Sequence, residues 1–166
     1  MLREPQTMTG ANVFIEGVGF IGTTKEVDYP KLEFTTWTSN SGLGEREVDT
    51  GLLKAMTATF TFEEYNKIYF EILSKRWNEK ANIYVKQNIT EGIKQIPLVV
   101  TFKGNLKSIE FPKYEHGKEV NVVLELAVSF YKFEYNNDEQ FLVDLNNMIF
   151  TINGQDKFQE IRANLL

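Results

Sequence analysis

Strict alternation of side chains marks the stretch from Leu52 to Phe62. One row is mostly apolar or aromatic, and the other is rich in threonine. A period of two residues is typical of a β-strand with one buried face, because successive side chains point to opposite sides of a sheet. Similar patterns, bounded by glycine, proline or asparagine, predict further strands at 12–16, 20–29, 32–37, 82–90, 96–111, 119–135 and 140–152.

Helical periodicity occurs at two places in the chain. Apolar residues recur at spacings of three and four between Tyr65 and Leu73, which predicts an amphipathic helix over about 63–76. Near the C-terminus, Asp156 followed by Gln159 resembles a capping box and predicts a short terminal helix. Elsewhere strands follow strands without βαβ alternation. The predicted fold is therefore mainly β (α+β): one domain over 1–166, an antiparallel β-barrel or sandwich with one central helix and a short C-terminal helix.

Two segments indicate that the domain extends beyond its own core. Residues 38–47 are polar and punctuated by glycine, with neither period, which predicts an extended exposed loop. The predicted strand at 119–135 is 17 residues long, against a usual length of about 5–6. Long strands leave unpaired edges, which proteins either block or pair with another chain. With only four prolines to block edges, the pattern predicts a self-assembling β protein whose edges pair between subunits.

Composition excludes several kinds of chemistry. The 166 residues include no cysteine and one histidine, His116. Metal sites built on thiolates are therefore excluded, and metal clusters or catalytic triads built on histidine have at most one histidine to use. We expect no metal, no cofactor and no catalytic residues. The formal net charge is −5, whereas proteins that grip nucleic acid usually carry a basic stripe. No window reaches the roughly 18 apolar residues of a spanning helix, so no membrane segment is expected.

One motif favours a different class of protein. Gly17, Gly19 and Gly22 form the pattern G-x-G-x-x-G after a predicted strand, which would suit a nucleotide-binding enzyme. That site needs a helix to begin at the glycines so that its N-terminus faces the phosphates. The residues that follow are β-branched and charged and end at Pro30. The nucleotide-binding enzyme is therefore a lower-ranked alternative, together with a monomeric single-strand-binding barrel, which the acidic balance disfavours.

Four stretches of the sequence resemble the major tail tube protein of contractile-tailed bacteriophages. The most specific is the C-terminal part, Asp144 to Asp156 followed by Arg162-Ala163. The others are Asn12 to Gly17 with Glu26 to Leu32, the glycine loop Ser41 to Gly44 followed by Val48 to Leu52, and Phe102 to Glu110. The chain differs from the family pattern in having Glu45-Arg46, rather than a proline, just after the glycine loop.

The resemblance implies a structural virion protein without enzymatic activity. Family members assemble into stacked hexameric rings that form the inner tube of a contractile tail and conduct DNA. The implied partners are other copies of the chain, the tail sheath, tape-measure and baseplate proteins, and DNA in transit. The implied location is the virion tail, assembled in the bacterial host cytoplasm. A tube subunit of a DNA-free contractile bacteriocin or secretion system remains the alternative.

The resemblance, taken together with the long strands, also suggests which residues contact other subunits or rings. The expected contacts lie in the glycine loop and in the long strand near the C-terminal third of the chain. They are Ser41, Gly42, Leu43, Gly44, Glu45 and Arg46 in the loop, and Val122, Leu124, Leu126 and Val128 in the strand.

Overall fold

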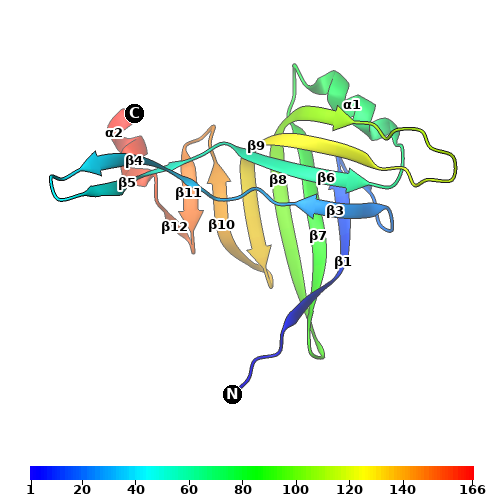
Figure 1. Ribbon diagram of the computed structural model, residues 1–166, viewed down its shortest axis with the longest axis horizontal. Helices are drawn as coiled ribbons and strands as arrows, with labels where there is room; N and C mark the ends of the chain where they lie inside the picture. The colour runs from blue at the N-terminus through cyan, green and yellow to red at the C-terminus, as the bar shows by residue number, and fades with distance from the viewer.

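Ten of the twelve strands belong to one antiparallel sheet in the computed structural model, which describes residues 1–166 (Figure 1). Along the main path the order is β12-β11-β10-β9-β8-β7-β1-β2, and β6 joins at β9 and carries β3 on its other side. The strands are β1 (Gln6–Ile15), β2 (Val18–Gly19), β3 (Thr24–Asp28), β6 (Met56–Phe62), β7 (Ala81–Glu91), β8 (Lys94–Glu110), β9 (Val122–Tyr135), β10 (Asp138–Asp144), β11 (Ile149–Ile152) and β12 (Gln155–Asp156).

The remaining elements are two strands and two helices. Strands β4 (Phe34–Asn40) and β5 (Glu45–Leu53) form a separate two-stranded sheet. Helix α1 (Lys67–Lys75) lies at one end of the large sheet, and α2 (Gln159–Leu165) lies near the C-terminus (Figure 1). The predicted β-rich fold with a central and a C-terminal helix is therefore confirmed.

Strand β9 changes its partner halfway along, and this bends the sheet. Its first half, 122–128, pairs with β6, and its second half, 130–135, pairs with β10. Strand β8 follows β9 along both halves, with a register shift beside Gly104. At this shift the Ser129 hydroxyl donates to the Lys103 carbonyl oxygen at 3.2 Å. Consequently β3 and β6 cross over β1, β7 and β8 as a second layer (Figure 1).

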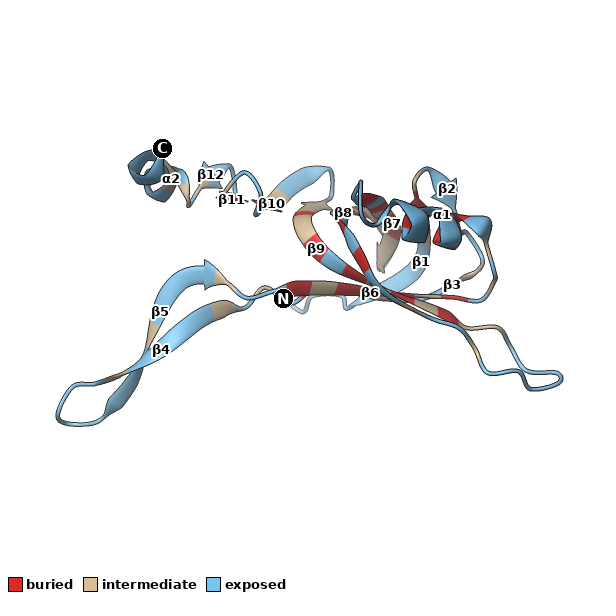
Figure 2. Ribbon diagram, turned by 90° about the horizontal axis from the view of Figure 1, so that it is seen from above, coloured by how far each residue is buried: buried red, intermediate tan, exposed pale blue.

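The core fills the space between the two layers. One cluster of buried apolar residues draws on β1, β6, β7, β8, β9 and α1, and every second residue of β6 belongs to it. Figure 2 shows the buried positions concentrated where these strands face one another. Alternation along the strands thus has its expected cause, since one face of each strand packs inward.

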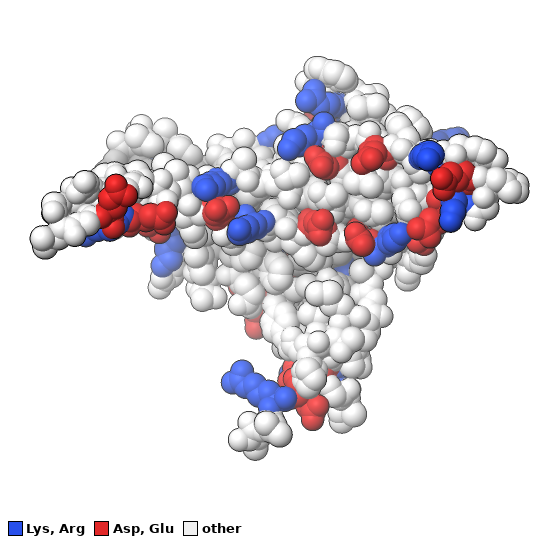
Figure 3. All heavy atoms as spheres, in the orientation of Figure 1, with Lys and Arg blue, Asp and Glu red and all other residues white.

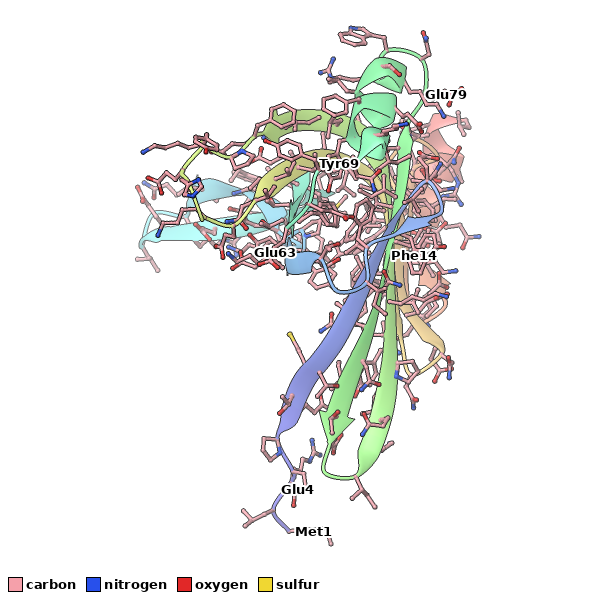
Figure 4. All side chains as sticks on the ribbon, turned by 90° about the vertical axis from the view of Figure 1, so that its right-hand side faces the viewer. Met1, Glu4, Phe14, Glu63, Tyr69 and Glu79 are labelled. Atoms are coloured by element: carbon pink, nitrogen blue, oxygen red, sulfur yellow. The ribbon has the colours of Figure 1, made fainter.

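Helix α1 closes one end of this core. Ile68, Tyr69 and Ile72 are its buried residues, and the Tyr69 ring lies 5.8 Å from Phe20 and 5.7 Å from Phe62 between centroids. Figure 4 shows Tyr69 pointing from α1 into the interior, where burial raises the pKa of its hydroxyl well above the ordinary value. The helix is shorter than the predicted 63–76, because Asn66 caps its N-terminus by accepting a hydrogen bond from the Ile68 amide at 3.0 Å.

Several predicted boundaries were wrong. The predicted strand 140–152 is two strands, β10 and β11, because Asp144 accepts a bond from the Asn147 side chain at 2.6 Å and the chain turns there. The predicted strand 20–29 begins only at Thr24, where it forms β3 and pairs with β6. Strand β9 begins at Val122, later than the predicted residue 119.

The predicted loop at 38–47 is the largest error. Most of it is strand, and only 41–44 forms a turn, in which the Asn40 side chain accepts from the Gly42 amide at 3.0 Å and Gly42 has a φ of 85°. Both faces of this hairpin are exposed, and beyond its root only Trp37 and Val48 among its strand residues are apolar, so no apolar row reveals a period of two.

Replacing Gly104 by alanine should strongly destabilise the protein. A Cβ atom there would collide with the carbonyl oxygen of Ala127 at the bend, and backbone cannot move aside as cheaply as a side chain. We expect a loss of about 2–4 kcal/mol in the free energy of unfolding, measured by urea denaturation. Gly10→Ala is the matched control because nothing lies within 4 Å of its Cβ position. Equal stability of the two variants would contradict the proposed role of Gly104.

Candidate assembly interface

The β4–β5 hairpin projects away from the core as a free arm (Figures 1 and 2). It continues the β3–β6 ribbon, since the Lys54 amide donates to the Glu33 carbonyl oxygen at 2.8 Å. Its root is fixed by Phe34, whose ring centroid lies 6.1 Å from that of Phe150. Beyond this root nearly every residue is exposed. A two-stranded hairpin is marginally stable in water, so this arm needs a partner.

The two faces of the hairpin differ in chemistry. By register, Glu45, Glu47 and Asp49 lie on one face, opposite Asn40, Thr38 and Thr36. Trp37 and Val48 form a directly opposed pair on the other face, and the Trp37 side chain is 56% exposed. The hairpin is therefore amphipathic, with an acidic face and a face that carries an uncovered aromatic ring. These features were missed by the sequence reasoning, which treated 38–47 as irregular.

The predicted contact residues of the glycine loop come together at the tip of this hairpin. All six are exposed, and the Leu43 side chain is fully so. The Ser41 hydroxyl and amide both donate to the carbonyl oxygen of Gly44, at 3.2 and 3.1 Å, which holds the turn closed. The residues are Ser41, Gly42, Leu43, Gly44, Glu45 and Arg46.

The four residues predicted in the long strand occupy a different environment. Val122, Leu124, Leu126 and Val128 are buried in the core of the subunit itself. Strand β9 is bonded to β6 on one side and to β8 on the other along this stretch. Neither their side chains nor their strand edges are open to another chain, so these four join the two layers within the subunit. Alternation predicts a buried face but does not say whether the subunit or its neighbour buries it.

Open strand edges lie elsewhere. Strand β3 pairs only with β6, and β12 pairs only with β11. Strand β1 pairs with β7 along one edge, but its other edge meets β2 only at Phe14 and Ile15 and accepts from the Phe20 amide at Val13, which leaves 6–12 without a strand partner there. Such edges are templates for pairing with another chain, and the subunit has several of them.

A second arm at the same end of the molecule carries the C-terminus. Strands β11 and β12 and helix α2 lie apart from the hairpin in Figure 2. Asp156 holds this arm together: it accepts from the Arg162 guanidinium at 2.8 Å and from the Phe158 amide at 3.0 Å, while Arg162 also donates to the Met148 carbonyl oxygen at 2.8 Å. Partial burial raises the pKa of Asp156, but these bonds outweigh it and hold the pKa below its ordinary value.

The glycine motif does not form a phosphate site. Gly17 lies in the turn between β1 and β2, and no helix starts in the segment after Gly22. The Phe20 amide, which would face a phosphate, already donates to the Asn12 side chain at 3.0 Å and to the Val13 carbonyl oxygen at 2.9 Å. The geometry therefore contradicts the nucleotide-binding alternative.

Charge and length limit other kinds of site. Lys and Arg are interspersed with Asp and Glu along the face that carries β3 and β6 (Figure 3), where Lys25 pairs with Glu119 at 3.0 Å. No group of three or more acidic, histidine or cysteine side chains is placed to hold a metal ion. Neither helix has the length and apolar run needed to cross a membrane.

This architecture is that of a structural β subunit with unpaired edges and projecting arms. Residues 5–165 match the model of the family described as phage tail tube protein FII. The chain belongs to that family, whose members are structural rather than enzymatic, and it is a tail tube protein of a contractile phage or a related injection system.

Individual relatives agree with the family assignment. The chain is 22% identical over 173 aligned positions to the tail tube protein of Escherichia phage P2, covering 97% of each chain. Its fold is similar to a chain of the PVC extracellular contractile injection system described as a sheath/tube terminator, with a TM-score of 0.60, 14% identity and coverage of 81% of this chain and 99% of that one. A PVC sheath-tube complex gives a TM-score of 0.55 at 15% identity, covering 75% and 88%.

Acidification should loosen the C-terminal arm. Because the folded-state pKa of Asp156 is depressed, its stabilising contribution is present above the unfolded pKa and is lost as the pH falls through the folded value. Asp156→Asn should mimic this at neutral pH and speed amide exchange in 157–166 about 5- to 30-fold, measured by hydrogen exchange. Asp138→Asn is the control, since its carboxylate makes no ion pair. Unchanged exchange in Asp156→Asn would contradict the role of this carboxylate.

Proposed function

We propose that six copies of this chain close into a ring, and that rings stack into the inner tube of a contractile tail that conducts DNA. The observation that carries the proposal is the β4–β5 hairpin, an amphipathic ribbon that the subunit leaves uncovered on both faces. Ring symmetry offers a physical reason for assembly, because closing a sheet around an axis removes its open edges. In the tube, the hairpin would hold neighbouring copies in a fixed position relative to one another.

The same proposal extends to partners and to the channel. The sheath would surround the tube, the tape-measure protein would set its length, and the baseplate would nucleate it in the cytoplasm of the bacterial host. The subunit would then be found in the virion tail. A net charge of −5 suits a conduit, because phosphates are retained by lysine and arginine and an acidic wall lets DNA slide.

A DNA-free contractile particle is the second candidate. It is favoured by the fold similarity to chains of the PVC injection system, whereas the phage P2 relative favours the phage tube. The two candidates differ in whether capsid and terminase genes lie beside the gene. They also differ in whether purified particles hold nuclease-protected DNA.

Shortening the hairpin tests the assembly proposal. Residues 38–47 would be replaced by Asn-Gly, a sequence that favours a tight two-residue turn and preserves the opposed pair Trp37 and Val48. The variant should keep the melting temperature of the wild type, because the segment is outside the core. Electron microscopy should show no long tubes where the wild type forms them. Tubes of normal length from this variant would contradict the proposed role of the hairpin.

A further inference from the structure

Three stacked rings form an exposed aromatic surface at the other end of the molecule. The Phe111 ring lies between those of Tyr65 and Phe70, with centroid separations of 6.1 and 5.9 Å and interplanar angles of 13° and 12°. Each side chain is about half exposed. We call Tyr65, Phe70 and Phe111 the aromatic ladder. Ordered, stacked rings that remain in water are typical of an interaction surface.

The ladder borders a hollow formed by the β8–β9 connection, 111–121. A space of about 250 Å³ is lined by Tyr65 and by 112–120, including Tyr114, whose side chain is 84% exposed. Within this hollow, Glu115 pairs with Lys113 at 3.4 Å and Glu119 pairs with Lys25 at 3.0 Å. Lys118 makes no ion pair in the subunit. The hollow therefore offers aromatic surface beside one cation without a partner.

The ladder and the hairpin lie at opposite ends of the subunit. In Figure 1, drawn with the longest axis horizontal, the β4–β5 hairpin forms the left-hand end, and α1 and the 111–121 loop occupy the right-hand end. In a head-to-tail assembly, an element that projects from one end of a copy meets the opposite end of the next copy. This arrangement would bring the two surfaces together in neighbouring copies.

The chemistry of the two surfaces is complementary. The hairpin presents Trp37, which is 56% exposed although Val48 lies directly opposite it, and Leu43, which is fully exposed. Aromatic rings packed on aromatic rings are favoured contacts.

We infer that the β4–β5 hairpin of one copy docks on the aromatic ladder and the adjoining hollow of a neighbouring copy. The inference rests on the proposed assembly into tubes and specifies its receiving surface. Trp37 and Leu43 pack against the ladder and Tyr114.

Cross-linking provides a direct test, because the chain has no cysteine of its own. Leu43→Cys and Tyr114→Cys would be combined in one chain, assembled, and treated with a short bis-maleimide. The expected result is a series of covalent dimers, trimers and larger multimers in a denaturing gel. When the two single variants are mixed and assembled, cross-linking should give covalent dimers and nothing larger, because each chain then carries only one cysteine. The matched control pairs Leu43→Cys with Ile93→Cys, a fully exposed site at the tip of the β7–β8 hairpin. This control should give no covalent multimers.

The outcomes separate the docking inference from the assembly proposal. Tubes that form without a link between residues 43 and 114, or with a link between 43 and 93, would overturn the docking and leave the tube proposal standing. A subunit that never assembles at any concentration, even with preformed tube ends present, would overturn both.

Assembly thresholds give a second readout of the docking. Phe111→Ser removes the middle ring and should raise the protein concentration needed for tubes about tenfold or more. Trp77→Ser is the control: Trp77 is another exposed aromatic side chain but has no stacked ring partner in the ladder. Both variants should remain folded at the temperature of the assembly assay, although Phe111→Ser loses the two ring contacts of Phe111. Equal thresholds for the two variants would contradict the inference.

Discussion

The structure depends on one feature of its sheet, the change of partner along β9. Because β9 is bonded to β6 in its first half and to β10 in its second, one continuous strand belongs to two layers. The bend occurs beside Gly104, where the backbone of Ala127 comes too close for any side chain. All of the core packing follows from it, since the buried residues fill the angle between the layers. The direction in which the β3–β6 ribbon leaves the body is set by the same bend.

The ribbon explains why the subunit is suited to assembly. Its root is part of the second layer, and its far end, β4–β5, extends beyond the core with both edges unpaired. A folded core thus positions an arm that the core does not cover. At the opposite end, the rings of Tyr65, Phe70 and Phe111 are ordered by stacking and remain exposed. A subunit with incomplete surfaces at two ends is a physical basis for head-to-tail polymerisation.

The sequence predicted the parts of the fold that a hydrophobic core dictates. Alternation in Leu52–Phe62 and the helical spacing of Ile68 and Ile72 come from burial on one face; the helix is present, and the strand is present from Met56 to Phe62, while Leu52 and Leu53 end the separate strand β5. The hairpin was missed because its partner is absent from the subunit, so neither face is apolar enough to show a period. Val122 and Leu124 were assigned to an interface for a different reason: their alternation indicates a buried face but not which surface buries it, and here the core of the subunit does. Alternation of apolar residues indicates that one face of a strand is buried. Which surface buries that face depends on contacts with residues distant in the sequence.

The central claim is that uncovered surfaces of one copy are covered by another in a symmetric tube. Cryo-electron microscopy of the wild-type protein, over a series of concentrations and with tube ends added as nuclei, tests it most directly. The account predicts hollow tubes of stacked sixfold rings in which density for β4–β5 lies against a neighbouring copy. A subunit that remains monomeric throughout, or tubes in which the hairpin stays in solvent, would contradict it.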